Sequence, residues 1–348
     1  MSVICIAEDR LSEIIPAKLL LLSLARHCPD VPVVIFFPPA TPEFEIWLER
    51  FPQVTLRKTK FHGIAEWNVK PYVLEVLLKE GNAQVWWLDT DIILTSDFRQ
   101  HFNSFSPDTL LFGQQPYLGD YQNGGKRAEG WGFQVARILP FEINGGVIRV
   151  HSSHLPFLKK WQELTESELY KQAQRQPFYS RAVHVQCDQD LITALLESKE
   201  FSHIPVEFVR RGKDIIQYAV PNGYSLMERL EDLGSGLPPL IHSLGLKPWT
   251  PADARLKQKR GFDLYYSSLF LEISPYNYVA LQYKDEIDEN LPWIKYSAAG
   301  HCFRTLGLGN PALMGLPLVA IYSFFLFLKT FLKRNTPQLI ALLKPQRD

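Results

Sequence analysis

The sequence has little of what marks several large classes of protein. Its 348 residues include four cysteines, and no two of them have the spacing of paired metal ligands. Scattered cysteines indicate buried thiols in a reducing compartment and argue against a disulfide framework. The 37 basic residues equal the 37 acidic residues in number, so the chain lacks the basic excess of a general nucleic-acid binder. We therefore expect no nucleic-acid partner.

The N-terminal residues also lack the features of a secretory signal. The chain opens on the strand-like Val3-Ile4-Cys5-Ile6-Ala7, without a basic start or a small-residue cleavage site. We therefore expect a cytoplasmic protein. Hydrophobic residues make up 46% of the chain and charged residues 21%, which is typical of a globular protein with a sizeable core.

Strand and helix patterns alternate along the first part of the chain. Apolar runs predict the strands, and apolar residues at helical spacing predict the helices between them. Strand–helix–strand units connect right-handedly, which makes a parallel sheet the default and predicts an α/β fold. Strands are expected at 3–7, 31–37, 54–57, 85–88 and 141–150, and helices at 11–27, 43–51, 73–80, 155–175 and 188–196.

Two carboxylates directly follow the fourth predicted strand. Residues 85–88 are continuously apolar, as expected of a strand buried on both faces of a parallel sheet, and Asp89 and Asp91 come next. Two carboxylates in such a place are costly to bury unless a cation lies between them, and ligands bind at the carboxyl ends of these strands. The pattern predicts a divalent-metal site that would hold a diphosphate. An exposed Asp-rich turn is the alternative.

Other polar residues and glycines lie near the starts of predicted elements. Lys70 precedes the helix that leads to the strand before Asp89, where it could reach a phosphate or a sugar hydroxyl. The alternative is an ordinary solvated lysine. Asn144, Gly145 and Gly146 lie near the start of a predicted strand, where glycines permit close approach of a ligand or form a bulge.

Two later segments carry further chemistry. Asp188-Gln189-Asp190 opens a predicted helix, and helix capping alone accounts for at least one of these acids. His242 follows an apolar pair and precedes Gly245 and Lys247. A lone histidine in such a context is usually a core residue, but a histidine followed by Gly, Lys, Pro and Trp in so short a stretch is much rarer.

Taken in order, these segments resemble the family 8 glycosyltransferases. That family comprises retaining enzymes that include glycogenin and bacterial lipopolysaccharide galactosyl- and glucosyltransferases. The resemblance covers residues 1–250 and implies a GT-A fold, a single nucleotide-binding α/β domain around a mostly parallel sheet. The matching pieces are the first strand to Asp9, Lys70, Leu88-Asp89-Thr90-Asp91, Asn144-Gly145-Gly146-Val147, Asp188-Gln189-Asp190 and the segment from His242 to Trp249.

The resemblance also implies a metal and a donor substrate. Asp89, Asp91 and His242 would coordinate Mn²⁺, with Mg²⁺ as the alternative, because a mixed carboxylate and imidazole set suits Mn²⁺ better. The reaction would move a hexose, glucose or galactose, from a UDP-sugar to an acceptor hydroxyl with retention. Lys247 and Gly245 would lie beside the diphosphate.

The rest of the donor site follows in the same way. Ala7 and Asp9 would lie against the uridine, and the donor sugar would be surrounded by Lys70, Asn144, Asp188 and Gln189. Gly145 and Asp190 would also belong to the donor site, and the catalytic residues would be Asp188, Gln189 and Lys247.

The sequence departs from the family pattern in three places. Arg10 and Leu11 stand where the family usually has a tyrosine, so no residue is identified that would stack on the base. Lys70 stands where arginine is frequent, and the spacing from His242 to Lys247 is one residue shorter than expected.

The retaining outcome admits two routes. Double displacement needs a carboxylate nucleophile, for which Asp188 and Asp190 are the candidates. Gln189 lies between them, and an amide is a poor nucleophile. A front-face substitution, with the acceptor attacking on the side from which the diphosphate leaves, is therefore preferred.

The C-terminal residues form an apolar stretch with a basic end. No charged residue occurs from Thr305 to Leu328, and residues 317–332 are predicted to form one helix. Basic residues at its end disfavour a span from the cytoplasm and favour an interfacial helix on anionic lipid through residues 311–334. A buried C-terminal helix is the alternative. The expected organisation is a catalytic domain at 1–250, an extension packed on it at 251–305 and the membrane-associating tail at 306–348.

A membrane contact would make the acceptor a lipid-linked or envelope glycan. Two other functions stay open at this point. One is a sugar-nucleotide-binding module without turnover, and the other is a membrane-tethered scaffold that predicts no Mn²⁺-dependent binding of UDP.

Overall fold

The chain divides into two compact units in a computed structural model. The first comprises Met1–Tyr218, Pro238–Leu244 and Val279–Glu289, and the second Ala219–Leu237, Gly245–Tyr278 and Asn290–Asp348. The residues that the structure describes are 2–60, 66–115, 124–219, 223–245, 247–249, 261–287, 293 and 295–335.

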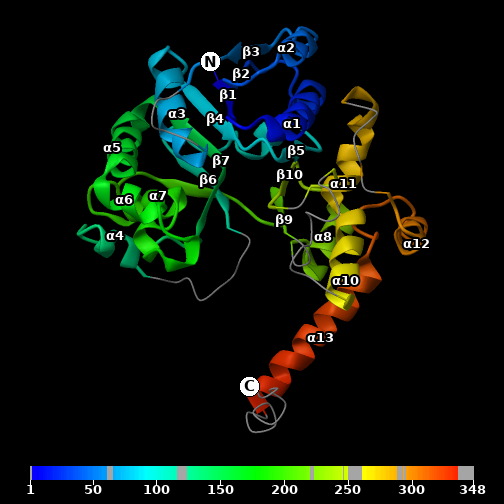
Figure 1. The fold of residues 1–348 in the computed structure, drawn as a ribbon. Helices are drawn as coiled ribbons and strands as arrows, with labels where there is room; N and C mark the ends of the chain where they lie inside the picture. Colours follow the sequence, from blue (N-terminus) through cyan, green and yellow to red (C-terminus); the bar gives the residue numbers. More distant parts are fainter. Residues whose placement is uncertain are drawn as a thin grey trace. The chain divides into compact units, whose positions relative to one another are not determined.

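The first unit is built on a seven-stranded sheet with the strand order β3-β2-β1-β4-β7-β6-β8 (Figure 1). β1 pairs in parallel with β2 and β4, whereas β7 is antiparallel to both β4 and β6. The sheet is therefore mostly parallel, and the predicted α/β class is confirmed. The bounds are β1 Ser2–Ala7, β2 Val33–Phe36, β3 Val54–Arg57, β4 Gln84–Leu88, β6 Leu110–Gln114, β7 Ile143–His151 and β8 Val206–Val209.

The helices of this unit follow the predicted pattern with two corrections. The helix predicted from residue 73 begins at Lys70, so this lysine is part of α3. The helix predicted over 155–175 is interrupted at Ser167, whose extended backbone ends α5 and whose hydroxyl caps α6 by accepting from the Tyr170 amide. The helices are α1 Ile14–His27, α2 Pro42–Leu48, α3 Lys70–Lys79, α4 Lys126–Gly130, α5 Leu155–Glu166, α6 Glu168–Gln174 and α7 Asp188–Glu197.

In the described part of the chain, seven short 3₁₀ helices connect these elements. They are η1 Leu11–Glu13, η2 Glu66–Val69, η3 Phe98–His101, η4 Ser152–His154, η5 Phe178–Ser180, η6 Val183–Val185 and η7 Leu281–Glu286.

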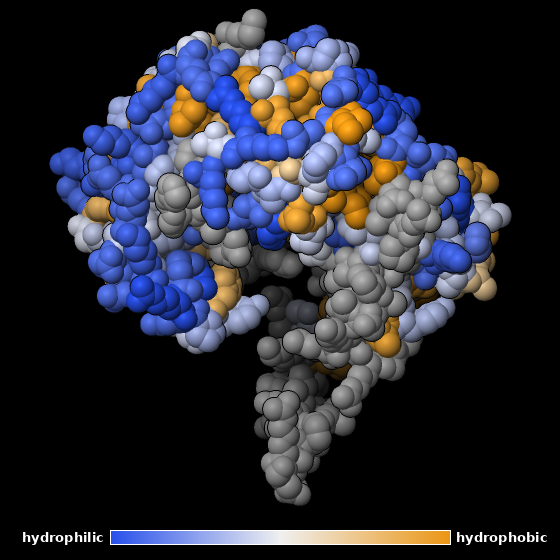
Figure 2. Space-filling model, turned by 45° about the horizontal axis from the view of Figure 1, so that its top comes forward, coloured by the Kyte–Doolittle hydropathy of each residue, from blue (hydrophilic) through white to orange (hydrophobic). Residues whose placement is uncertain are grey.

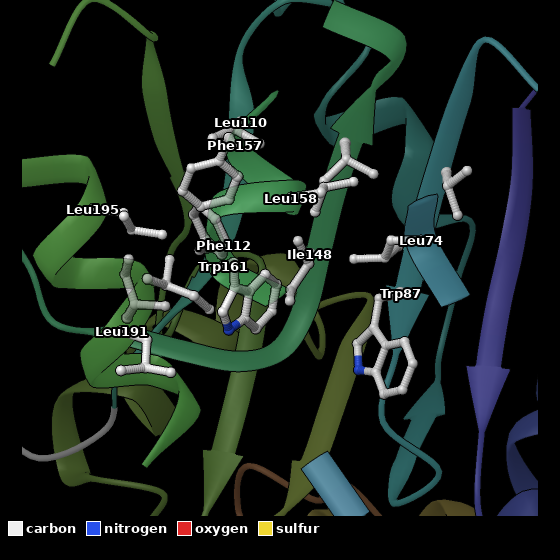
Figure 3. Close-up of a cluster of buried hydrophobic side chains, with 14 of the residues drawn as sticks. Leu74, Trp87, Leu110, Phe112, Ile148, Phe157, Leu158, Trp161, Leu191 and Leu195 are labelled. Atoms are coloured by element: carbon white, nitrogen blue, oxygen red, sulfur yellow. The ribbon is translucent and has the colours of Figure 1, made fainter. Parts of the chain in front are cut away.

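A large apolar cluster of the first unit lies between the sheet and the helices α3, α5 and α7. Trp87 of β4, Phe112 of β6 and Ile148 of β7 point toward side chains of these helices (Figure 3). Trp161 of α5 and Leu191 of α7 lie on the other side of this layer, and all five are buried. This packing fixes β4 and the start of α7, which carry polar groups at their ends.

A second, three-stranded sheet brings a distant segment to the end of β4. β10, Leu240–Ser243, pairs antiparallel with β5, Ile92–Leu94, and parallel with β9, Ile215–Tyr218. In this register His242 lies opposite Ile92, and the Ser243 amide donates to the Asp91 carbonyl at 3.0 Å. His242 is thereby placed beside the Asp-x-Asp motif.

The second unit is helical in its described residues. The buried Arg229 of α8 donates to the carbonyls of Pro311, Ala312 and Met314 and so holds the segment before α13. The helix predicted over 317–332 forms within α13. The helices are α8 Leu226–Ser235, α10 Gly261–Glu272, α12 Ala298–Leu306 and α13 Leu316–Asn335, while α11, Pro275–Ala280, runs from this unit into the first.

The first turns of α13 are packed and its later turns are exposed. Val319 packs with Tyr266 and Phe270 of α10 in a small cluster. From Ile321 onward the described apolar side chains of α13 are mostly exposed. Even so, none of the described helices is both long enough and apolar enough to cross a membrane.

Candidate functional site

Three potential metal ligands come together at the end of β4. Asp89, Asp91 and His242 each place one ligand atom so that all three atoms lie within 4.8 Å of one another. His242 Nε2 is 3.0 Å from Asp91 Oδ1 and 3.9 Å from Asp89 Oδ2. The carboxylates are partly exposed and the histidine is buried, so the cluster opens to solvent on its acidic side.

Gly146 of β7 makes room for the histidine ring. A Cβ at this position would lie 2.4 Å from His242 Cε1 and 2.7 Å from His242 Nδ1. The Gly146 carbonyl accepts from the Asp89 amide at 2.8 Å, so one glycine both receives the ring and holds the motif backbone. The need for a glycine here is steric.

The donor set fits a divalent metal of the first transition row. His242 Nε2 faces Asp91, and the buried Nδ1 has no hydrogen-bond partner among the described residues. Two carboxylates and one imidazole form a mixed set that suits Mn²⁺. The Trp87 indole N–H donates to Asp89 Oδ1 at 2.7 Å, an outer contact of the kind that orients metal ligands.

A buried ion pair lies next to this cluster. Lys70 Nζ donates to Asp188 Oδ2 at 3.2 Å and lies 3.7 Å from Asp89 Oδ1. Burial alone would lower the pKa of Lys70, but the attraction of Asp188 and Asp89 outweighs it and keeps that pKa above its usual value. Burial raises the pKa of Asp188 despite the neighbouring lysine. Lys70 is therefore a fixed buried cation, and the reading of it as a solvated lysine is wrong.

Gly145 and Gln189 complete the wall beside the ion pair. A Cβ on Gly145 would lie 3.0 Å from Lys70 Nζ and 3.6 Å from Gln189 Cγ, so the three residues are close neighbours. The Gln189 Oε1 atom is buried without a hydrogen-bond partner among the described residues. An orphaned carbonyl oxygen of this kind suits a ligand hydroxyl. Asn144 contributes a backbone brace, since its Oδ1 accepts from the Gly146 amide at 3.0 Å.

The hydrogen bonds of Asp190 connect it to Arg127 and Cys187, outside the metal-ligand cluster and the Lys70–Asp188 ion pair. Its Oδ1 accepts from Arg127 Nε at 2.6 Å, and its Oδ2 accepts from the Cys187 amide at 2.9 Å. Arg127 also donates to Glu142 at 3.0 Å. Asp190 therefore closes the N-terminus of α7 and binds an arginine, and both carboxylate oxygens are used.

Glu8, at the end of β1, was not among the site residues predicted from the sequence. Glu8 is buried, and its Oε2 accepts from the Thr90 hydroxyl at 3.2 Å, between the two aspartates of the motif. Ala7 is partly buried at the strand end, and Asp9 is exposed. An acid directly after a buried strand was the available signal, but it was assigned to Asp9 alone.

Gly245 and Lys247 belong to the second unit. Gly245 has φ +121°, a conformation that favours glycine, and Lys247 is buried. Their assignment to the diphosphate stays a prediction.

No family model and no curated protein sequence matches the chain. The chain is similar to several solved structures of glycosyltransferases, at 11–15% sequence identity. The bifunctional glycosyltransferase WbbM matches at 13% identity and TM-score 0.49 over 84% of this chain and 50% of its own. The glycosyltransferase GlyE of Streptococcus pneumoniae TIGR4 matches at 13% identity and TM-score 0.45 over 82% of this chain and 63% of its own.

The galactosyltransferase LgtC, solved with donor and acceptor sugar analogues, matches at 14% identity and TM-score 0.42 over 82% of this chain and all of its own. The present chain thus spans about half the length of WbbM and under two thirds of GlyE. Since these TM-scores lie below 0.5, the function proposed below depends on the residues of the site.

Proposed function

We propose that this chain is a metal-dependent, retaining glycosyltransferase whose first unit is a GT-A domain. It would transfer a hexose from a UDP-sugar to a hydroxyl of a glycan or lipid-linked acceptor. The observation that carries the proposal is the convergence of Asp89, Asp91 and His242 beside the buried Lys70–Asp188 pair. Ligands of α/β sheets bind at this carboxyl edge of the strands.

The site supplies charges suited to a sugar diphosphate. Asp89, Asp91 and His242 would hold the metal, which when bound supplies a Lewis acid for the departing diphosphate. Lys70 keeps Asp188 and Asp89 fixed by charge, so little reorganisation is needed when the donor enters. Gln189 Oε1 is free to accept a hydroxyl of the donor sugar.

The contacts of the two acidic candidates favour front-face substitution. Asp190 has both oxygens engaged, and Asp188 is held by Lys70 in an ion pair. A carboxylate so engaged is a poor nucleophile because attack on a sugar would forfeit these bonds. In the proposed step the bond from the anomeric carbon to the diphosphate breaks and the bond to the acceptor oxygen forms on the same face. The acceptor's hydroxyl proton leaves with the diphosphate.

Thermal stabilisation by UDP with Mn²⁺ tests the donor site. UDP held at about 100 times its Kd should add roughly 2.7 kcal/mol to the free energy of unfolding. The shift should disappear with EDTA and in Asp91→Asn. Asp97→Asn is the matched control, because the Asp97 side chain is 20% exposed and that of Asp91 is 22% exposed.

Absence of a UDP shift in the unaltered chain would rule out the proposed donor site. A metal-dependent shift without hydrolysis of any UDP-sugar would instead identify a sugar-nucleotide-binding module. Retention is tested separately by NMR of the product's anomeric proton, and an inverted product would contradict the proposed stereochemistry.

We also propose that the exposed part of α13 lies on an anionic membrane surface. At about 100° per residue, six of its eight exposed apolar residues share a stripe about 120° wide, while Leu326 and Phe327 lie outside it. The sequence adds Lys329, Lys333 and Arg334 at positions outside this stripe. An apolar stripe beside basic residues is the pattern of an interfacial helix. The stripe consists of Ile321, Phe324, Phe325, Leu328, Phe331 and Leu332.

Flotation with phosphatidylserine vesicles tests this surface. The double variant Phe324→Ser/Phe331→Ser should lose vesicle binding, because it removes two aromatic side chains from the stripe. Phe327→Ser is the matched control, since Phe327 is exposed but lies outside the stripe. Equal binding by all variants would exclude the stripe as a lipid contact.

A further inference from the structure

The residues after β1 form a closed clamp around one buried carboxylate. Glu8 Oε1 accepts from the Asp9 and Arg10 amides, each at 3.0 Å, and from Arg10 Nε at 2.8 Å. Glu8 Oε2 accepts from Arg10 Nη2 at 2.9 Å. The two parallel bonds hold the guanidinium in the plane of the carboxylate, which a single contact would not do.

This clamp is tied directly to the metal motif. The Thr90 hydroxyl donates to Glu8 Oε2, and Thr90 separates Asp89 from Asp91. β1 and β4 are parallel neighbours, so the residues that follow them leave the sheet at the same edge. The plane of Arg10 is therefore set relative to the site where the diphosphate would bind.

Exposure distinguishes the two members of the clamp. The Glu8 side chain is 5% exposed and the Arg10 side chain 54% exposed. An arginine whose edge is bound and whose side chain remains half accessible can present a flat cationic surface. Guanidinium planes stack on nucleobases as aromatic rings do.

We infer that Arg10, held by Glu8, is the platform on which the uracil of the donor stacks. The inference deepens the proposed function and depends on it. It also accounts for the absence of an aromatic residue after the first strand, where Arg10 and Leu11 stand. The alternative is that Arg10 is a point charge for the phosphates, which would make it indifferent to the base.

Calorimetric titration of UDP and of inorganic diphosphate, both with Mn²⁺, separates these two roles. Loss of a stacking partner typically weakens binding by about tenfold or more. Arg10→Ala should therefore bind UDP about tenfold more weakly, with unchanged affinity for diphosphate. Arg10→Lys should behave like Arg10→Ala, because it keeps the charge and loses the plane. Arg10→Tyr should recover most of the UDP affinity.

Arg99→Ala is the matched control. Arg99 makes the same clamp on the acid two residues before it, with Nε at 2.9 Å from Asp97 Oδ1 and Nη2 at 2.7 Å from Asp97 Oδ2. Its removal should change the affinity for neither ligand. The melting temperature of each variant without ligand reports whether the fold is kept.

Three results would overturn the platform. They are unchanged UDP affinity in Arg10→Ala, equal weakening of UDP and diphosphate, and a full recovery by Arg10→Lys. Absence of UDP binding by the unaltered chain is a different result, because it removes the proposed function and the platform together.

Discussion

The two units of this chain bury their apolar residues to different extents. In the first unit, the sheet and the helices α3, α5 and α7 enclose a large apolar cluster. Hydrophilic residues predominate on the face of the molecule that Figure 2 shows, with apolar residues between them. The described residues of the second unit form two small clusters. Among the described residues, 21 large apolar side chains are exposed, and 15 of them belong to the second unit.

Because of this difference, we expect the two units to depend on different residues for their stability. The first unit obtains its stability from its own burial, and its polar groups are concentrated at one edge of the sheet. The second unit leaves apolar area uncovered, and a patch of this kind marks a contact surface. Core substitutions should therefore be costly in the first unit, whereas surface apolar residues of the second should be nearly silent for stability.

The largest expected effect is in the core of the first unit. Trp161 is fully buried between α5 and its neighbours, so Trp161→Ala should lower the free energy of unfolding by about 3–5 kcal/mol. Urea denaturation measures this loss. A change below about 1 kcal/mol would show that this core is not the main source of stability, since exposed sites give values of that size.

The stabilities of the two units should also respond to pH in opposite directions. Burial lowers the pKa of His154 in the first unit to about 4, while its Nε2 donates to the Asp108 carbonyl. Between about pH 6.5 and 4 the unfolded chain binds this proton and the folded chain does not, so the first unit loses up to about 3 kcal/mol as pH falls. His154→Gln should flatten this dependence.

The second unit should respond in the other direction. Burial raises the pKa of Asp232 to about 6, although its bond from the Tyr224 hydroxyl opposes the shift. Between about pH 4 and 6 the folded state holds a proton that the unfolded state has lost, so this group stabilises the unit at low pH and that stability is lost as pH rises. Hydrogen exchange, read separately in peptides of each unit, measures both trends, and Asp232→Asn should remove the second.

A smaller effect is expected from matched glycine substitutions. Gly146→Ala would force a methyl group to within 2.4 Å of the His242 ring, so it should cost about 1–3 kcal/mol and abolish Mn²⁺-dependent stabilisation by UDP. Gly234→Ala in α8 meets no atom within 4 Å and should be neutral or stabilising by up to about 1 kcal/mol. Retention of the Mn²⁺ response in Gly146→Ala would contradict the packing of the ring against this glycine.

The smallest effect is expected on the exposed stripe. Phe324→Ser should change the free energy of unfolding by less than about 0.5 kcal/mol, because exposed residues contribute little. Phe270→Ala in the same unit is buried and should cost about 3–5 kcal/mol. Chemical denaturation of both variants would show whether the effect on the free energy of unfolding depends on the exposure of the side chain or only on its hydrophobicity.

Local patterns were sufficient for much of the fold. Continuous apolar runs located β1 and β4, and the apolar periodicity located α1 and α7 within a few residues. β6, β8 and β9 were missed, because each is four or five residues long and lies among loop signals. Strand order was also beyond local reasoning, since β7 pairs between β4 and β6 through contacts distant in sequence.

The candidate site divides in the same way. The motif around Asp89 and the approach of His242 were foreseen, the latter through the family resemblance, and the structure brings them together. Asp190 was predicted to belong to the donor site, and its ion pair with Arg127 was not predicted, because this arginine lies on α4, far away in the sequence. The role of Glu8 was missed for a related reason: its Thr90 contact depends on strands that meet only in the folded chain.

The positions of the three metal-ligand candidates along the chain determine when the candidate site can form during synthesis. Two of them are made early, whereas His242 lies on β10, which needs β5 already in place as a pairing partner. A nascent chain that stops before Leu240 has both carboxylates and lacks His242. The three-residue cluster is therefore complete only once β10 has paired with β5 in the second sheet.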